Sequence, residues 1–140
     1  MGLKYHPERG TILICDFDGF KEPEMLKRRP VVVVSPRYRN RDDLCTIVPL
    51  STTPPRPVCP YHCRITIDPP LPPPYDAAEV WVKADMLCAV SFSRLSVPFD
   101  GKDLSGERRH VVCVLSAENM KCVSMCILSG LGFGSLTPHL

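Results

Sequence analysis

The sequence predicts a mostly β fold that ends in one α-helix, and three observations lead to this prediction. Residues 31–34 are four consecutive valines, whose β-branched side chains favour a strand over a helix. Several further short segments are apolar or alternate between apolar and polar residues. Near the C-terminus, apolar residues instead recur at helical spacing. Short strands of uneven length followed by a late helix are typical of a small, strongly bent β-barrel.

The first expected strand covers residues 10–17, which carry apolar side chains on both faces. Residues 18–27 lack periodicity and contain glycine, proline and several charges, so they predict a loop. Strands then follow at residues 31–34 and 44–50. Further elements are expected as strands at residues 63–68, 78–90 and 109–115, a short strand or turn at 92–97, and a polar loop at 100–106.

A proline-rich loop insertion covers residues 54–76, since nine of the sixteen prolines fall between residues 54 and 74. Proline donates no backbone hydrogen bond and fixes φ, so this stretch cannot be central sheet throughout. Within it, residues 63–68 alternate and fit an edge strand, while residues 71–74 fit extended polyproline chain. A partner-binding loop and a rigid connection are both open interpretations, and short proline runs favour the connection.

The C-terminal helix is expected at residues 117–129. Ser116 suits the N-cap, and Glu118 places a negative charge in the first turn, where the helix dipole favours it. Gly130 suits the end of the helix. The apolar residues at helical spacing are Met120, Val123, Ile127, Leu128 and Leu131.

Length and composition predict a single domain over residues 1–140, with enough chain to bury a core. The first ten residues lack the apolar segment of a signal peptide, and no apolar run approaches membrane-spanning length. We therefore expect a cytoplasmic protein that does not bind a membrane.

The net charge of +2 is small, but residues 27–41 hold six basic residues and no acidic ones. Such a local excess of positive charge attracts a polyanion. The alternative is a solvated connection whose arginines keep a sheet edge soluble.

Arg29 stands out because of the two strands at residues 31–34 and 44–50. If these strands pair antiparallel, the start of the first lies near the end of the second, which brings Arg29 close to Ser51. A guanidinium beside hydroxyl groups suits a phosphate. The alternative is that Arg29 pairs with Asp16 or Asp18 and that the hydroxyl residues only form a turn.

The eight cysteines divide into two sets. Those inside expected strands are interpreted as small buried hydrophobes, namely Cys15, Cys45, Cys88 and Cys113. The others form two Cys-x3-Cys pairs that allow a structural zinc site, namely Cys59, Cys63, Cys122 and Cys126. This spacing is less diagnostic than Cys-x2-Cys, so we expect no metal. On a helical wheel, Cys122 and Cys126 lie opposite the apolar stripe, so that face is either exposed or covered by the loop or a second subunit.

Four segments resemble, in the same order, the PemK/MazF toxins of type II toxin–antitoxin systems. They are RGTILICDF at residues 9–17, PEMLKRRPVVVVSP at 23–36, VPLSTT at 48–53 and VKADMLCAVSFSRL at 82–95. The resemblance implies an SH3-like barrel with a C-terminal helix, usually a homodimer. It also implies a cofactor-free, metal-independent endoribonuclease that cuts single-stranded RNA, such as mRNA, at short sequences. It further implies a cognate antitoxin that blocks the RNA groove, with any contact with DNA made through the antitoxin complex.

Carried over residue by residue, the resemblance assigns Arg29 as the phosphate clamp and Ser51 to the catalytic Ser/Thr position. It assigns Asp85 as the candidate base and Lys83 as the candidate acid. Lysine replaces the family's arginine at Lys83, and lysine cannot hold a phosphate bidentately. The residues predicted to bind RNA are Arg28, Thr52, Thr53, Glu24 and Phe17. The glycines that often flank the loop acid are replaced by Glu22 and Lys27, so the loop is expected to differ in shape.

Two other functions stay open. One is a non-catalytic barrel toxin that binds a protein target such as gyrase, and the other is a zinc-stapled interaction module. The gyrase-poisoning toxins do not need an arginine beside a serine, so Arg29 and Ser51 favour the nuclease. The histidines form no recognisable pair with a nucleophile, and none is assigned a catalytic role.

Overall fold

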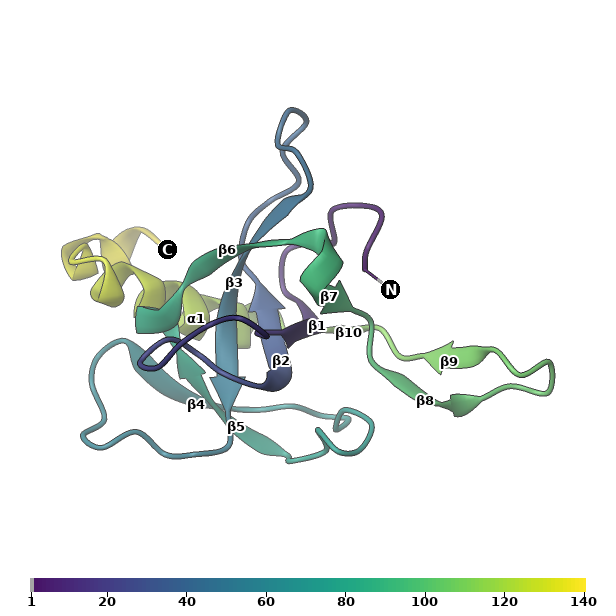
Figure 1. Ribbon diagram of the computed structural model, residues 1–140. Helices are drawn as coiled ribbons and strands as arrows, with labels where there is room; N and C mark the ends of the chain where they lie inside the picture. The colour runs from purple at the N-terminus through teal and green to yellow at the C-terminus, as the bar shows by residue number, and fades with distance from the viewer. Residues whose placement is uncertain (1) are drawn as a thin grey trace.

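The computed structural model describes residues 2–140 and consists of antiparallel strands followed by one α-helix (Figure 1). The strands are β1 (Thr11–Asp16), β2 (Arg28–Val33), β3 (Leu44–Ser51), β4 (His62–Thr66), β5 (Glu79–Lys83), β6 (Cys88–Ser91), β7 (Leu95–Ser96), β8 (Phe99–Lys102), β9 (Arg108–His110) and β10 (Cys113–Val114). The helix is α1 (Ala117–Gly130), and the 3-10 helices are η1 (Ala84–Met86), η2 (Phe92–Arg94) and η3 (Gly134–His139).

The main sheet has eight strands in the order β10-β1-β2-β3-β5-β4, with β6 added to β3 and β7 added to β1. Every pairing in it is antiparallel. Within residues 2–140, no strand pairing joins β4 back to β10, so the closed barrel remains a prediction. The mostly β fold with one C-terminal helix is confirmed.

The valine run forms the centre of this sheet. The register pairs Val31 with Pro49, Val32 with Val48 and Val33 with Ile47, which confirms the expected antiparallel pairing of β2 and β3. Successive residues of a strand point to opposite faces, so the run is buried on both sides. Val31, Val32 and Val33 are each 0% exposed.

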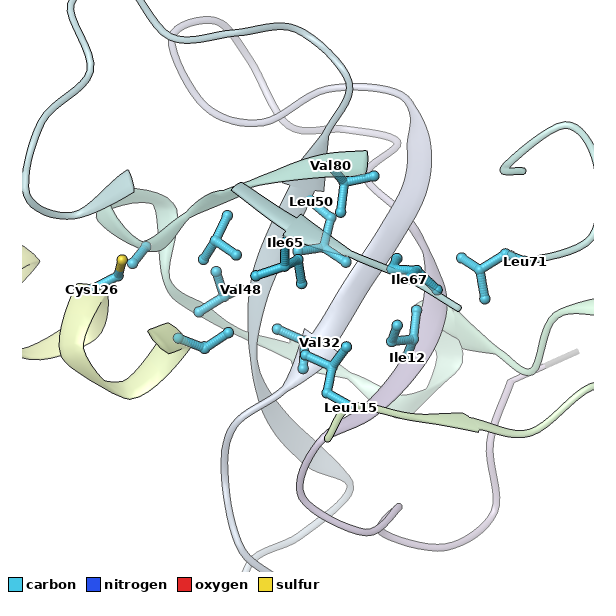
Figure 2. Packing of buried hydrophobic residues seen from close by; sticks show 13 residues of the cluster. Ile12, Val32, Val48, Leu50, Ile65, Ile67, Leu71, Val80, Leu115 and Cys126 are labelled. Atoms are coloured by element: carbon cyan, nitrogen blue, oxygen red, sulfur yellow. The ribbon is translucent and has the colours of Figure 1, made fainter. Parts of the chain in front are cut away.

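The core consists of two clusters on the two faces of the central strands. One contains Val32, Val48 and Leu50 together with residues of β4, β5 and α1, and Figure 2 shows its side chains converging. The other contains Val31 and Val33 together with residues of β1, β3, β6 and β7. Successive side chains of β2 and β3 point alternately into one cluster and then the other. This alternation determines which residues at the strand ends share a face.

The helix α1 begins as the sequence predicts, because the Ser116 Oγ accepts a hydrogen bond from the Asn119 backbone N–H at 3.1 Å. The helix packs on the core through Val123 and Cys126. The helix face that carries Cys126 was expected to be either exposed or covered, and at Cys126 it is covered by the 54–76 insertion: this side chain is 4% exposed and packs beside Cys63 of β4. No helix within residues 2–140 combines the length and the apolar character needed to cross a membrane.

Three sequence-predicted elements differ from the structure. The strand expected at residues 78–90 is interrupted by η1, and the strand expected at residues 109–115 is split into β9 and β10. The polar loop expected at residues 100–106 is wrong in part, because β8 and β9 form a hairpin there. All residues of β8 and β9 are exposed, so the hairpin has no buried face and leaves no apolar alternation in the sequence.

Candidate functional site

A pocket of about 290 Å³ lies where β2 begins and β3 ends. Continuing the register two residues beyond the Val31–Pro49 pair sets Arg29 opposite Ser51, on the same face of the sheet. The pocket is lined by Lys27, Arg28, Arg29, Pro30, Leu50, Ser51, Thr52, Thr53, Pro74, Tyr75, Ala77 and Val80. The structure therefore brings together five of the predicted site residues, and it adds a wall from the proline-rich stretch.

Arg29 enters this pocket with most of its guanidinium unused. Its Nε donates a hydrogen bond to the Leu26 carbonyl oxygen at 2.8 Å, which fixes the direction of the side chain. Neither terminal nitrogen bonds to another group within residues 2–140, and no carboxylate there lies within ion-pair distance. Partial burial lowers the pKa of Arg29 from its ordinary value of 12.5, yet arginine keeps its charge in proteins. Two parallel donors therefore remain available for an anion.

Asp16, considered as an alternative partner for Arg29, forms its ion pair with the neighbouring Arg28 instead. The Arg28 guanidinium donates to the Asp16 carboxylate at 3.0 Å across the β1–β2 pair. Arg94 donates to the backbone carbonyl oxygens of Asp16 and Asp18 at 2.9 and 2.7 Å. The alternative in which Arg29 pairs with Asp16 or Asp18 is therefore wrong, because Arg28 occupies the face that carries the Asp16 carboxylate.

The hydroxyl residues at the end of β3 form a local turn. The Ser51 Oγ accepts a hydrogen bond from the Thr53 backbone N–H at 3.1 Å, so the turn expected as an alternative is present. The Ser51 hydroxyl proton has no acceptor in the described part of the chain, and Thr52 and Thr53 are exposed. The turn holds Ser51 in place and leaves its hydroxyl able to donate.

The loop before β2 lies beside Arg29. Glu24 and Arg29 line the same shallow depression, and the Glu24 carboxylate accepts the Lys21 backbone N–H at 3.0 Å. Lys27, the non-glycine residue with a positive φ in the described part of the chain, has a φ of 68°. Glycine adopts this left-handed conformation readily and lysine rarely does, so the backbone keeps a glycine-like bend just before the two arginines.

Phe17 is a correction to the predicted RNA-binding residues. Its side chain is 1% exposed, belongs to the second core cluster, and meets the Phe20 ring edge-on at 5.1 Å between ring centres. The pattern of β1 places position 17 on the same buried face as Leu13 and Cys15. A buried ring is unavailable to a nucleobase.

Lys83 and Asp85 do not line the pocket with Arg29. The β3–β5 register pairs Ser51 with Trp81, so Lys83 lies two residues farther along β5. The Asp85 carboxylate instead faces the Nε2 of His62 at 3.6 Å.

His62 was assigned no role from the sequence, because its contact depends on the long-range pairing of β4 with β5. Its Nδ1 accepts the Cys59 backbone N–H at 3.0 Å, so in the neutral ring the proton lies on Nε2, facing the Asp85 carboxylate. Tyr75 of the pocket wall was also missed, because the neighbouring prolines indicated only a spacer.

The four cysteines whose spacing allows a zinc site do not come together as one group. In the described part of the chain, no three His, Cys, Asp or Glu side chains form a group that could hold a metal ion. Cys63 packs against the core cluster that contains Cys126, and the interaction of the two thiols raises the pKa of Cys63 and lowers that of Cys126. Cys59 interacts instead with Tyr61. The structure therefore gives the zinc-stapled alternative no four-cysteine site.

Comparison with known proteins matches most of the chain to one family. The family described as "PemK-like, MazF-like toxin of type II toxin-antitoxin system" matches residues 8–129. The chain is 40% identical over 53 residues to "Endoribonuclease toxin MazF" of Escherichia coli strain K12, a match that covers 37% of this chain and 48% of that protein. The match to "Endoribonuclease MazF" of Escherichia coli O157:H7 has the same extent. The chain thus spans about half the length of the curated relatives that it matches.

Solved structures resemble the fold over nearly its whole length. A crystal structure of MazF from Deinococcus radiodurans has a TM-score of 0.58 and 22% identity, covering 92% of this chain and 99% of that one. An endoribonuclease from Mycobacterial species, in complex with its cognate antitoxin, has a TM-score of 0.56 and 20% identity, covering 90% and 95%. At this identity, the likeness establishes a shared fold.

Proposed function

This chain belongs to the PemK-like, MazF-like toxin family of type II toxin–antitoxin systems, and on that premise we propose that it is an endoribonuclease that cuts single-stranded RNA. The observation that carries the proposal is the pocket at the ends of β2 and β3. There, the free guanidinium nitrogens of Arg29 share a cavity with the Ser51 hydroxyl. The pair supplies the planar cation and the hydrogen-bond donor that a phosphate requires.

The proposed reaction needs no metal ion. The ribose 2′-oxygen attacks the adjacent phosphorus as its proton is removed, and the bond between phosphorus and the 5′-oxygen breaks as that oxygen gains a proton. The products carry a 2′,3′-cyclic phosphate and a 5′-hydroxyl. Arg29 holds the phosphate and stabilises the charge that builds up on it, and Ser51 donates a second hydrogen bond. One such donor lowers the barrier by about 3 kcal/mol, which speeds the reaction roughly a hundredfold.

The two proton transfers are assigned to Asp85 as base and Lys83 as acid, and this part of the proposal has its own test. A general base must reach the proton that it removes, directly or through one water. Asp85 faces His62 and lies outside the Arg29 pocket. The Asp85→Asn variant therefore distinguishes a role as catalytic base from a role in the contact with His62. A loss of cleavage of about a hundredfold or more supports catalysis. A change in unfolding free energy alone assigns Asp85 to the His62 contact.

We further propose that the bent sheet is an SH3-like barrel, that the protein forms a homodimer in the cytoplasm, and that a cognate antitoxin inhibits it. Support for the antitoxin comes from the family and from the similar Mycobacterial endoribonuclease, whose structure contains its cognate antitoxin. An antitoxin that inhibits cleavage must cover the RNA-binding surface or distort it. The Arg29 pocket is the part of that surface on which the proposal depends.

The test uses purified protein free of antitoxin, a defined single-stranded RNA and excess EDTA. We expect fragments that end in 2′,3′-cyclic phosphate and begin with 5′-hydroxyl. Replacing the ribose at the cleaved position by 2′-deoxyribose should stop cleavage there, because the attacking oxygen is then missing. Intact RNA in the presence of protein with a folded circular-dichroism spectrum overturns the proposal. If such a protein instead arrests DNA metabolism, it is the non-catalytic toxin considered above.

A further inference from the structure

A second pocket, of about 360 Å³, adjoins the Arg29 pocket. Its walls are residues 72–75 of the proline-rich stretch on one side and residues 96–101, which lead into β8, on the other. Arg28, Pro74 and Tyr75 line both pockets, so the two cavities are neighbours that share a wall. The second cavity therefore lies within reach of the nucleotide next to a phosphate held at Arg29.

The second pocket differs in chemistry from the first. It holds two aromatic side chains, Tyr75 and Phe99, among prolines and aliphatic residues, together with the polar residues Ser96 and Asp100. The cation among its lining residues is Arg28, which is already bonded to the Asp16 carboxylate at 3.0 Å. A cavity with aromatic walls and one neutralised cation favours a flat, largely apolar group over another phosphate.

The position of Phe99 is fixed by the hairpin that carries it. The hairpin of β8 and β9 extends away from the main sheet (Figure 1), and a lone two-stranded hairpin is marginally stable in water. The Arg108 guanidinium lies over the Phe99 ring, 4.4 Å from its centre. At the tip, the Asp103 carboxylate accepts the backbone N–H groups of Ser105 and Glu107 at 2.9 and 3.0 Å. These contacts hold the ring at the mouth of the pocket, where it is 41% exposed.

We propose that this second pocket binds a nucleobase of the RNA strand, next to the phosphate held by Arg29, with Tyr75 and Phe99 as its aromatic walls. This inference rests on the proposed ribonuclease function and adds a base-binding site that selects where the RNA is held. The proline-rich stretch then has a function beyond connecting strands, because Pro74 and Tyr75 form the boundary between the phosphate and the base. Stacking on an aromatic side chain is the general means by which proteins hold unpaired bases.

The test is a double-mutant cycle between protein and RNA. After the cleaved position has been mapped, each base around it is replaced in turn by an abasic nucleotide, in RNA that carries 2′-O-methyl ribose at the cleaved position. In the wild-type protein, we expect one position at which base removal weakens binding by about fivefold to a hundredfold. In the Phe99→Ala variant, that same base removal should cost less than twofold, because the wall on which the base stacks is gone.

Two controls keep the result interpretable. Tyr38→Ala removes a tyrosine that is 57% exposed in a different pocket, and it should leave the base effect unchanged. If Phe99→Ala does not fold, Phe99→Tyr should retain the base effect and Phe99→Leu should lose it. If the binding losses from Phe99→Ala and from removal of each base simply add, in a protein that still cleaves RNA, the base pocket is overturned and the ribonuclease proposal stands. A folded protein that neither binds nor cleaves RNA overturns both.

Discussion

The two ends of the β2–β3 pair carry basic pockets that differ in how their arginines are used. The Arg29 pocket, of about 290 Å³, lies at the start of β2 and the end of β3. The pocket at the opposite end, which we call the Arg9 pocket, is larger at about 420 Å³ and contains Arg9, Arg41, Ser35 and Thr46. Each pocket contains two arginines and the Arg9 pocket is the larger, so neither volume nor the number of arginines singles out the Arg29 pocket as the phosphate site.

Hydrogen bonding does distinguish them. In the Arg9 pocket, a terminal nitrogen of Arg9 donates to the Ser124 hydroxyl and one of Arg41 donates to the Thr46 hydroxyl, each at 2.9 Å. In the Arg29 pocket, arginine and serine lie together without such a bond. An arginine–hydroxyl pair that is already made stabilises the fold. The unmade pair of Arg29 and Ser51 is open to a phosphate.

The largest expected difference between the two ends concerns cleavage. Arg29→Ala should lower the single-turnover rate of RNA cleavage by about a hundredfold to a thousandfold, the usual cost of removing one donor to developing negative charge. Arg41→Ala removes a guanidinium from the Arg9 pocket and should change this rate less than about twofold, because the proposal puts the reacting phosphate in the other pocket and Arg41 is already bonded to Thr46. Equal losses in the two variants would show that the comparison is wrong.

Replacing the serine of each pocket should have a different consequence: Ser35→Ala should lower stability, and Ser51→Ala should lower the cleavage rate. Ser35 is 5% exposed, and its Oγ accepts the Thr46 backbone N–H at 3.0 Å, so Ser35→Ala should lower the unfolding free energy by about 1–3 kcal/mol. Ser51→Ala should instead reduce cleavage by about tenfold, the value of one hydrogen bond to a charged phosphate. Urea unfolding and cleavage rates, measured on both variants, check whether stability depends on Ser35 and cleavage on Ser51. A Ser51→Ala variant that loses stability and keeps full cleavage contradicts it.

The sequence predicted the centre of the molecule better than its edges. Residues 31–34 and 44–50 are apolar on both faces, and such strands have few alternatives to a central position in the sheet. Their pairing also placed Arg29 near Ser51. The β8–β9 hairpin was missed because Asp103 and the Arg108–Phe99 contact hold it, with no buried face to leave a pattern.

Long-range pairing accounts for the other differences. The six basic residues of positions 27–41 read as one cluster in the sequence, but β2 separates residues 27–29 from residues 37–41 and sends them to opposite ends. Asp85 meets His62 only through the pairing of β4 with β5. Neither arrangement follows from local composition, because each depends on which strands become neighbours.

Salt dependence gives a smaller contrast. Each phosphate of single-stranded nucleic acid that a cation neutralises contributes about −0.7 to the slope of log affinity against log salt. Arg28→Ala should therefore reduce the magnitude of this slope by up to about 0.7. Its ion pair with Asp16 is exposed and costs little to break. Arg39→Ala, in the connection at the other end, should leave the slope unchanged in a fluorescence-anisotropy titration. Equal changes in the two variants would assign RNA contacts to both ends.

The smallest expected contrast between the two ends is how much each contributes to the loss of stability at alkaline pH. Burial raises the pKa of Cys15, opposite Arg29 on β1, from 9.0 to about 12. Between these values the folded state keeps a proton that the unfolded state has lost, so the unfolding free energy falls by about 1.4 kcal/mol per pH unit. Below pH 9 this thiol contributes no slope. Burial also raises the pKa of Cys45 at the other end, but the Ser35 hydrogen bond and Arg41 oppose the shift. Between pH 9 and 11, Cys15→Ala should therefore flatten the fall more than Cys45→Ala, and the reverse order would place the more strongly shifted thiol at the Arg9 end.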